Sequence, residues 1–400
     1  MVVAWHVALV PLLALLLVSS YLTLYNLAIG LFGLPRRRQP PAAGQLPLLV
    51  VIPAHNEERV IAGAVRSVAA CDYPRDLVTV LVLADHCTDG TALAARDAGA
   101  DRVWVRETGP GGKQHAITAL LDALGASGEL DAWSGVLVVD SDNLVHPGLL
   151  QALSDHLAAG AWAVQAALDT RNPETGWVSR SYAAAYWVAN LMVQRSRARL
   201  RLSAQLGGTG MAIATATLRR IPFRPTSLVD DLEYTLQIVL AGGRVDYCEA
   251  PVYDEKPITL RASIRQRTRW MRGQAQVIRR FAVPLFGAAL RGNWPAADQF
   301  VMLWNPIAMA VTCGYFLLVL PFMGRGALEF WLAWNLGINL MFLIAARVPW
   351  TLWINAVWSL LYSFTWIPPV VWGFCTSRRT AWTHTEHVGA GMAAPGGVMS

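Results

Sequence analysis

The hydrophobic positions of the middle of the chain follow two alternating patterns. Residues 48–53 are a continuous apolar run of strand length, and residues 57–71 then carry apolar side chains at helical spacing. The alternation recurs with apolar runs at 78–84, 102–105 and 135–139 and helical patterns at 90–98, 113–124 and 147–157. Fully apolar strands that alternate with amphipathic helices predict an α/β domain whose parallel sheet is covered on both faces.

Four other stretches contain no Asp, Glu, Lys or Arg: residues 1–35, 300–324, 330–346 and 348–376. A helix that crosses a bilayer needs about 20 apolar residues, and 330–346 is at the short end of that range. The first stretch is too long for a signal peptide and lacks its basic start and cleavage site. The pattern predicts an N-terminal transmembrane helix within 1–35 and about three transmembrane segments within 300–376.

Composition supports a membrane protein. Hydrophobic residues make up 54% of the chain and charged residues 15%, where about 25% charged is usual for soluble domains. Ten of the 17 tryptophans lie at or after Trp294, as expected for rings at headgroup level. These values exclude a disordered chain, a coiled coil and a single ordinary soluble domain.

Basic residues predict the orientation. Arg36, Arg37 and Arg38 follow the first apolar stretch, and an Arg-rich run over 261–291 precedes the second. The positive-inside rule therefore places the middle of the chain in the cytoplasm and the N-terminus outside, in the inner (plasma) membrane. Three C-terminal spans would put Arg378 outside, so one segment is alternatively re-entrant or on the surface.

The flanking regions complete this organisation. Residues 260–296 are expected to form interfacial amphipathic helices, and 377–400 a flexible tail. The net charge of +6 is concentrated beside membrane segments, where it meets anionic lipid, so the bilayer is the expected partner and nucleic acid is not. Five scattered cysteines indicate neither a zinc site nor a disulfide framework. Nothing in the sequence predicts an oligomeric state.

Polar residues follow each predicted strand, where ligands bind in parallel sheets. These segments are 54–57, 85–89, 109–113 and 140–142. A single Asp at a strand end is usually a helix N-cap, but four successive polar ends indicate a site.

Within these segments, Asp140 and Asp142 can both address one hard cation, and Mg²⁺ or Mn²⁺ held by carboxylates and substrate phosphates is usual in phosphate chemistry. The chain has only two lysines, Lys113 and Lys256, and Lys113 behind a Gly-rich turn indicates a point charge near phosphate. The Walker A and dinucleotide-binding glycine patterns are both absent.

Two later segments carry further candidates. Asp230 and Asp231 open a predicted helix, where acidic residues also simply complement the helix N-terminus. Residues 266–270 belong to an Arg-rich amphipathic helix of the membrane-surface type. Such a helix can also present Arg269 to a diphosphate and Trp270 to a sugar face.

Taken in order, these segments resemble the motifs of membrane-integrated family 2 glycosyltransferases, the group that includes cellulose, hyaluronan and chitin-oligosaccharide synthases. The matching segments are 51–58, 83–91, 140–142, 207–210, 229–231 and 266–270. The resemblance implies an α/β fold: a GT-A (Rossmann-like) cytoplasmic glycosyltransferase domain over residues 45–260, flanked by transmembrane helices.

The resemblance also implies roles for particular residues. Asp231 would be the catalytic base, and Asp142 with Asp140 would hold Mg²⁺ or Mn²⁺. The implied nucleotide-binding residues are Pro53, Ala54, Asn56, Glu57, Asp85, Lys113, Asp140 and Ser141. The implied acceptor and diphosphate residues are Gly208, Thr209, Gly210, Gln266, Arg267, Arg269 and Trp270. Val229 and Asp230 replace the Thr-Glu that commonly precedes the base, so the hydrogen bonding around Asp231 is left open.

The implied activity is inverting transfer from a nucleotide-activated sugar, foremost a UDP-sugar, that forms β-glycosidic bonds in a polysaccharide or oligosaccharide. The alternative is the same chemistry performed once, on a lipid acceptor. A non-catalytic scaffold or transporter subunit is disfavoured, because the apolar segments lack the ionisable residues that mark transport paths. The identity of the sugar is not predicted.

Overall fold

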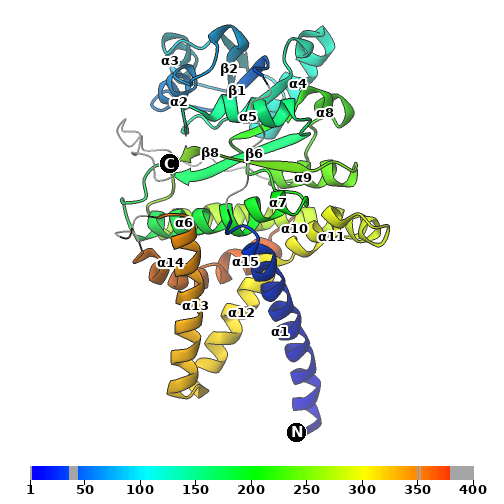
Figure 1. Cartoon of the computed structure of the whole chain (residues 1–400), viewed down its shortest axis with the longest axis vertical. Helices are drawn as coiled ribbons and strands as arrows, with labels where there is room; N and C mark the ends of the chain where they lie inside the picture. The colour runs from blue at the N-terminus through cyan, green and yellow to red at the C-terminus, as the bar shows by residue number, and fades with distance from the viewer. Residues whose placement is uncertain (1, 36–43, 349, 351–352, 379–400) are drawn as a thin grey trace.

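The computed structural model describes residues 2–35, 44–348, 350 and 353–378. An α/β domain lies at one end, a layer of helices lies beneath it, and long helices extend away from that layer (Figure 1).

The predicted alternation of strands and helices is confirmed in the first half of the domain. β1 (Leu48–Ala54), β2 (Val78–Asp85), β3 (Arg102–Arg106) and β4 (Gly135–Val138) each begin at the predicted residue. They pair in parallel in the order β3-β2-β1-β4. The helices that follow them are α2 (Ile61–Ala69), α3 (Thr91–Asp97), α4 (Lys113–Ser127) and α5 (Leu149–Ala158).

The second half of the eight-stranded sheet is mixed, so the prediction of a parallel sheet is wrong there. β7 (Met211–Ala214) runs antiparallel to β4 and to β6 (Ala163–Thr170), because the chain returns to the sheet at the end where β6 leaves it. β8 (Val245–Asp254) is parallel to β6, and β5 (Leu144–Val145) is antiparallel at the edge.

The strands β1, β2 and β4 are buried on both faces, as predicted, whereas the edge strand β3 is partly exposed. Successive side chains of a strand point to opposite faces. Leu49 and Val51 of β1 therefore pack with α4 and with α9 (Asp230–Leu240), whereas Val50 and Ile52 pack with α2 and α5. The carboxyl ends of β1, β2 and β4 are thereby fixed beside one another.

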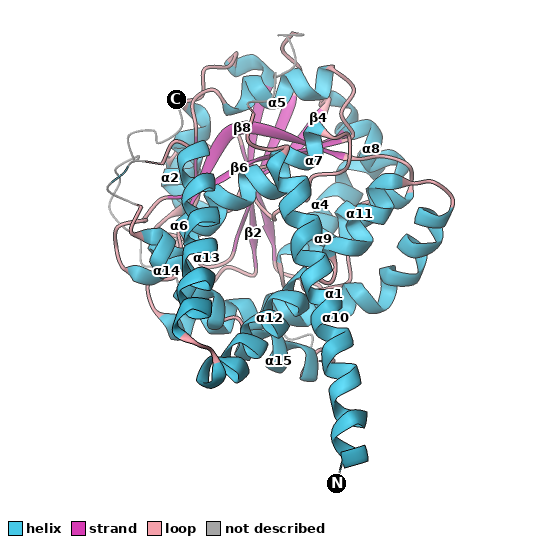
Figure 2. Cartoon of the chain, turned by 60° about the horizontal axis from the view of Figure 1, so that its bottom comes forward, coloured by secondary structure: helices cyan, strands magenta, loops and turns pink. Residues whose placement is uncertain are grey.

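The layer beneath the sheet contains helices from both halves of the sequence (Figure 2). α10 (Leu260–Leu290) begins at the expected residue and leads to α11 (Trp294–Met302). The sequence did not predict α6 (Trp177–Ala189), the π-helical turn η3 (Asn190–Arg195) and α7 (Ser196–Arg199), which lie in the same layer.

Three helices among the described residues are long and apolar enough to cross a membrane. They are the second part of α1 (Val2–Leu31), the unit formed by α11, α12 (Asn305–Val319) and η4 (Leu320–Phe322), and α13 (Arg325–Ala345). Their mean hydropathies are 1.7, 1.7 and 1.5. Phe330 on α13 is 70% exposed, as expected for a lipid-facing side chain.

The last predicted span, over residues 348–376, is not formed by the described residues. That segment folds as α14 (Asn355–Phe364) and α15 (Ile367–Cys375), ten and nine residues long, each too short to cross a bilayer. α14 packs on α6 and α15 packs on α10. The described C-terminal region thus has two candidate spans instead of about three, and the surface-lying alternative fits this last segment.

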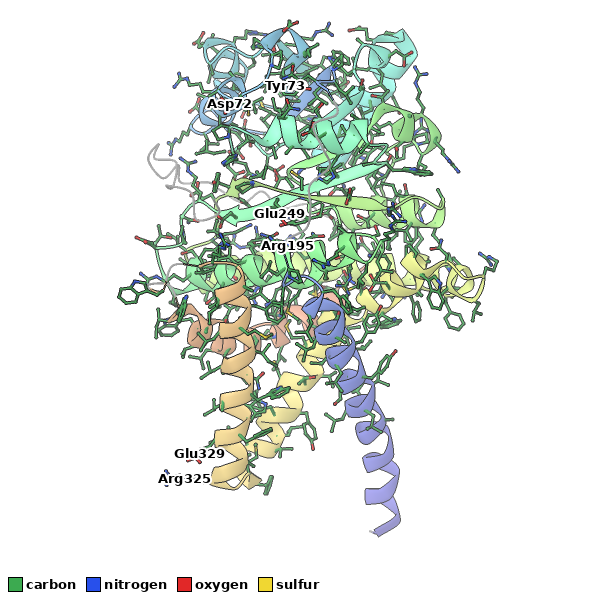
Figure 3. The ribbon with its side chains drawn as sticks, viewed as in Figure 1. Asp72, Tyr73, Arg195, Glu249, Arg325 and Glu329 are labelled. Atoms are coloured by element: carbon green, nitrogen blue, oxygen red, sulfur yellow. The ribbon has the colours of Figure 1, made fainter. Side chains whose placement is uncertain are left out.

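Two ion pairs lie at different levels of the molecule, one at the far end of α13 and one near the sheet (Figure 3). Arg325 and Glu329 form an exposed ion pair of 2.8 Å at the end of α13 far from the sheet. Arg195 and Glu249, with 2.8 Å between Nε and Oε1, lie where the helical layer meets the α/β domain. The 21 residues of α13 span about 30 Å, the thickness of a hydrocarbon core.

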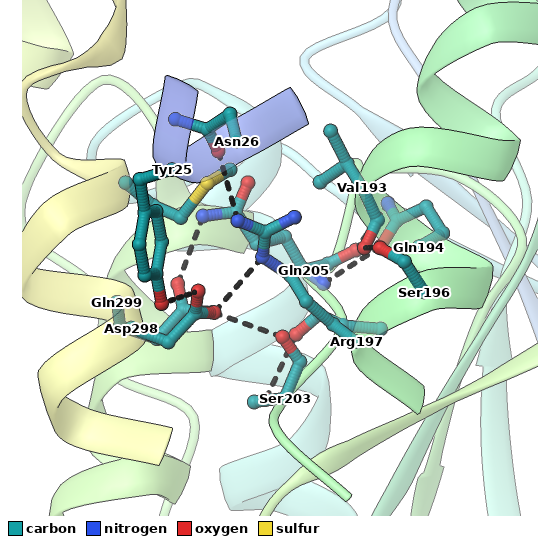
Figure 4. Close-up of polar contacts among 12 residues, drawn as sticks. Tyr25, Asn26, Val193, Gln194, Ser196, Arg197, Ser203, Gln205, Asp298 and Gln299 are labelled. Atoms are coloured by element: carbon teal, nitrogen blue, oxygen red, sulfur yellow. Dashed lines mark hydrogen bonds and ion pairs between the residues drawn. The ribbon is translucent and has the colours of Figure 1, made fainter. Parts of the chain in front are cut away.

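A buried polar junction ties α1 to the helical layer (Figure 4). Arg197 and Asp298 are both 0% exposed and form an ion pair with 2.9 Å between Nε and Oδ2. Tyr25 of α1 donates a hydrogen bond of 2.9 Å to the other carboxylate oxygen of Asp298. Arg197 also donates to the side-chain oxygen of Asn26 at 2.9 Å. The junction joins α1, α7 and α11 through a single charge pair.

Candidate active site

The polar strand ends converge on one cavity of about 520 Å³ between the sheet and α10. This confirms that the predicted segments meet. Fourteen of the predicted site residues line it: Pro53, Ala54, Glu57, Asp85, Lys113, Asp140, Ser141, Asp142, Gly208, Thr209, Asp231, Gln266, Arg269 and Trp270.

Three predicted residues are not among the lining residues. The side-chain oxygen of Asn56 accepts a 2.8 Å hydrogen bond from the amide of Thr88, which joins the loops after β1 and β2. A side chain on Gly210 would come within 2.8 Å of Val252, so this glycine permits close packing. Both residues therefore shape the walls of the cavity without lining it.

Arg267 also lies elsewhere, so its expected place beside the diphosphate is wrong. Gln266, Arg269 and Trp270 share one face of α10 because they are three and four residues apart. Arg267 is turned by about 100° from Gln266, and its guanidinium lies over the rings of Tyr362 and Trp366.

Asp231, the predicted base, lies in the first turn of α9 and faces the cavity. Burial, together with the adjacent charge of Asp230, raises the pKa of Asp231 to about 7. Its Oδ1 accepts a 2.7 Å hydrogen bond from the amide of Leu232. A side-chain carbon on Gly208 would lie 3.3 Å from Oδ2. A half-buried carboxylate with a pKa near neutrality is well suited to accept a proton at physiological pH.

Lys113 places a positive charge in the wall of the cavity. Its ammonium forms an ion pair with Asp140 and donates a 2.6 Å hydrogen bond to the carbonyl oxygen of Gly208. Burial opposes the charged form, but the surrounding carboxylates outweigh it and raise the pKa of Lys113. Lys113 therefore stays charged and faces the ligands that enter the cavity.

Asp140 and Asp142 fit a divalent cation held together with phosphate oxygens. Both line the cavity near a third carboxylate, Asp254, at the end of β8. Burial raises the pKa of Asp254 to about 6; Lys256 opposes this shift, and the charges of Asp142 and Asp140 add to it. The described residues contain no cluster of three or more His, Cys, Asp or Glu arranged for a metal. Mg²⁺ commonly takes only one or two carboxylates, so these two suffice when phosphates supply other ligands.

Asp85 organises the Gly-rich loop that borders the cavity. It is buried, forms an ion pair with Arg106, and accepts a 3.1 Å hydrogen bond from the amide of Gly112. Arg106 in turn donates to the carbonyl oxygen of Pro110 at 2.7 Å. Arg106 was not among the predicted site residues, although a charged residue at the end of an apolar strand beside a glycine loop was a usable signal.

Lys256 also lines the cavity, although it was not among the predicted site residues. Its buried ammonium forms an ion pair with Asp254 and donates a 2.9 Å hydrogen bond to the hydroxyl of Tyr186. Both lysines of the chain thus line the same cavity. Their rarity was the signal that could have identified Lys256.

The floor of the cavity is aromatic and basic. Trp270 meets the ring of Tyr182 edge-on, with 6.4 Å between the centroids. The hydroxyl of Tyr182 donates a 3.1 Å hydrogen bond to Gln266. Burial lowers the pKa of Arg269, and the carboxylates of Asp230 and Asp231 oppose that shift. A donor diphosphate and an acceptor hydroxyl can therefore meet between cationic, acidic and aromatic walls.

Comparison with known proteins identifies the family. The profile described as "Glycosyltransferase like family 2" matches residues 45–273, more than half of the chain. The chain belongs to glycosyltransferase family 2. It is therefore a transferase, and the family predicted from the motifs is confirmed.

Curated relatives of this family 2 glycosyltransferase include a probable glycosyltransferase of Bacillus subtilis, 25% identical over 59% of this chain and 57% of the relative. A beta-monoglucosyldiacylglycerol synthase of Nostoc is 27% identical over 62% of this chain and 54% of the relative. The chain thus spans little more than half the length of these relatives.

A solved structure confirms the GT-A fold of this family 2 glycosyltransferase. A mannosyltransferase of Pyrobaculum calidifontis, in complex with GDP-Man and Mn²⁺, superposes with a TM-score of 0.57 at 19% identity. The superposition covers 87% of this chain and 98% of the mannosyltransferase. The likeness in fold therefore extends over most of this chain.

Proposed function

We propose that this family 2 glycosyltransferase transfers one sugar from a nucleotide-sugar donor to a membrane lipid, with inversion at the anomeric carbon. The observation that carries the proposal is the position of Asp231. This carboxylate with a pKa near 7 faces a cavity whose floor is α10, and α10 belongs to the layer from which the membrane-type helices extend. A hydroxyl at the membrane surface is thus the acceptor best placed to reach the base.

The chain's own residues supply the donor side of the reaction. The Gly-rich loop held by Asp85, and Lys113 beside it, face the nucleotide and its diphosphate. Asp140 and Asp142 would hold Mg²⁺ or Mn²⁺, which when bound neutralises charge on the leaving diphosphate. Lys113 and Arg269 add fixed positive charge that needs no reorganisation as negative charge develops.

Asp231 supplies the acceptor side. Its carboxylate takes the proton of the acceptor hydroxyl as the oxygen attacks the anomeric carbon, and the bond to the nucleotide diphosphate breaks on the opposite face. An α-linked donor therefore gives a β-glycoside. General-base assistance of this kind is typically worth about 10²–10⁴-fold in rate.

The membrane topology follows from the same proposal. With one N-terminal span and two C-terminal spans, we propose that the N-terminus lies outside and that both the α/β domain and Arg378 lie on the cytoplasmic side. This arrangement keeps Arg378 inside, in accord with the positive-inside rule, which the predicted third C-terminal span did not. Accessibility of cysteines introduced before α1 and after α15 tests it directly.

A lipid acceptor is favoured over a growing polysaccharide by the names of three relatives. Beta-monoglucosyldiacylglycerol synthases of Nostoc, Trichormus and Synechocystis are 25–27% identical to the chain over more than half its length. Formation of a polysaccharide or oligosaccharide stays a prediction from the sequence. The nucleotide is proposed to be UDP, and the identity of the sugar is left to experiment.

The test is a product assay on the purified full chain in detergent micelles with Mn²⁺. Labelled UDP-glucose, UDP-galactose, UDP-N-acetylglucosamine and GDP-mannose are each offered with diacylglycerol, ceramide or polyprenyl phosphate. Mass spectrometry should find one lipid whose mass has increased by a single sugar. A ladder of products with many sugars would instead establish polymer synthesis, and absence of both donor binding and product would favour a scaffold.

A further inference from the structure

A positive charge lies buried beside the α14–α15 segment, residues Asn355–Cys375. Arg267 is 0% exposed, and its Nε lies 3.4 Å from the carbonyl oxygen of Ser263. Within the described part of the chain, neither Nη1 nor Nη2 has a hydrogen-bond partner. The guanidinium carbon lies 4.4 Å from the ring centroid of Tyr362 and 4.9 Å from that of Trp366.

The energetics of this arrangement indicate a missing interaction. Moving an ion out of water is unfavourable even after the protein relaxes, unless the ion is paired and hydrogen-bonded. The cation–π contacts with the two rings offset part of that cost, but they leave the donors of Nη1 and Nη2 without hydrogen bonds among the described residues. An apolar side chain of similar volume would avoid the cost altogether. A buried polar group without a partner therefore requires an explanation, and an anionic ligand supplies one.

The position of Arg267 restricts the source of that ligand. Both rings belong to the α14–α15 segment, which packs against α6 and α10 at the level where the membrane-type helices leave the layer (Figure 1). Leu361 and Trp372 on this segment are 51% and 58% exposed. Exposed aromatic and aliphatic side chains at such a level are typical of segments that lie among lipid headgroups.

A chain of aromatic contacts connects Arg267 with the active site. The ring of Tyr362 lies 5.5 Å from that of Tyr182, and Tyr182 in turn contacts Trp270 and Gln266. Trp270 and Gln266 line the catalytic cavity. Two aromatic side chains, Tyr362 and Tyr182, therefore connect a group held at Arg267 with the residues that line the cavity.

We propose that Arg267 binds the phosphate of a membrane lipid headgroup, which reaches it when the α14–α15 segment moves aside. The planar guanidinium can donate two parallel hydrogen bonds to a phosphate, a geometry that lysine cannot reproduce. The phosphate belongs either to the acceptor lipid or to a bilayer lipid beside it. The inference extends the proposed lipid acceptor, but the binding site can be tested without any transfer activity.

The first experiment measures binding by thermal unfolding of the full chain in dodecyl maltoside, a phosphate-free detergent. Phosphatidic acid is added, and the midpoint is followed by tryptophan fluorescence. The wild-type midpoint should rise with phosphatidic acid and not with diacylglycerol. Arg267→Met should need at least about tenfold more phosphatidic acid for the same rise. Without lipid it should unfold at or above the wild-type temperature, because an unpaired buried charge has been removed.

The matched control is Arg265→Met, which removes an exposed positive charge from the same helix and should keep the wild-type response. A wild-type response of Arg267→Met to phosphatidic acid would overturn the proposal. So would a lower midpoint of that variant without lipid, since it would assign Arg267 a purely structural role. If Arg267→Met does not fold, Arg267→Lys keeps the charge and should still lose most of the response; retention of the response would overturn the proposal.

A second experiment identifies the source of the phosphate. Phosphatidic acid carries no free hydroxyl, so it cannot itself accept a sugar at a hydroxyl group. Acceleration of diacylglycerol glycosylation by phosphatidic acid would assign the phosphate to a bilayer lipid. Glycosylation of polyprenyl phosphate that depends on Arg267 would assign it to the acceptor. If the thermal response succeeds while no glycolipid forms with any donor, the proposed function fails and the binding site stands.

Discussion

The raised pKa of Asp231 leads to a specific pH dependence. Burial and the charge of Asp230 raise its pKa from 3.8 to about 7. The carboxylate accepts a proton only when it is ionised, so about half of the enzyme is competent at pH 7 and about a tenth at pH 6. The value of kcat/KM for the donor should therefore fall about tenfold for each pH unit below 7. An aspartate with its usual pKa would leave the profile flat from pH 5 upward.

The perturbation that tests this cause is Asp230→Asn. Removal of the neighbouring negative charge favours the ionised form of Asp231, so its pKa should fall and the acidic limb should move to lower pH. Initial rates of labelled transfer between pH 5 and 8.5, at saturating acceptor and constant Mn²⁺, measure both profiles. A flat wild-type profile, or a limb that Asp230→Asn leaves in place or moves upward, would refute the reasoning.

Three further changes have defined outcomes. Gly208→Ala places a methyl group 3.3 Å from the carboxylate of Asp231 at a φ of +83°, so kcat should fall on the order of 10–100-fold. The control Gly242→Ala has the same backbone strain, at a φ of +85°, but no described atom lies within 4 Å of the added methyl group, so this variant should stay active. Asp298→Asn removes the charge that pairs with the buried guanidinium of Arg197 and should lower the free energy of unfolding, measured by denaturant titration, by about 3–5 kcal/mol. The control Glu329→Gln, in the exposed pair with Arg325, should lower it by less than about 1 kcal/mol. Asp142→Asn should raise the Mn²⁺ concentration for half-maximal rate about tenfold or more, read by metal titration.

Local periodicity predicted the first half of the domain well. The four parallel strands are continuous apolar runs separated by amphipathic helices, and each begins where the pattern begins. β7 was not predicted, because its four residues carry no periodic signal and its pairing with β4 and β6 depends on contacts distant in sequence. α6 was not predicted, because seven of its thirteen residues are buried and the sequence therefore lacks the polar face of an amphipathic helix.

The membrane region shows a different limit. Absence of charge over residues 348–376 is common to a spanning helix and to a segment packed on other helices. The turn between α14 and α15 at Thr365 and Trp366, followed by two prolines, divides the segment into short helices. Packing against α6 and α10, which hydropathy does not register, then covers their inner side.

The sequence predicted those parts of the candidate site whose residues lie close together in short motifs. Strand-end carboxylates and the face shared by Gln266, Arg269 and Trp270 follow from spacing alone. Tyr186 and Lys256 come to the cavity from α6 and the end of β8, and only the tertiary fold brings them together. Arg267 was misplaced because motif membership was taken as contact, although helix geometry turns it from the cavity.

The product of transfer by the wild type and by Asp231→Asn, with a labelled UDP-sugar, Mn²⁺ and lipid acceptors, tests the central claim most directly. The wild type should form a lipid carrying a single sugar with an inverted, β-configured anomeric carbon. Asp231→Asn should still bind the donor and should lose about 10²–10⁴-fold of the rate. Normal turnover by Asp231→Asn, or a polymeric product from the wild type, would contradict the account.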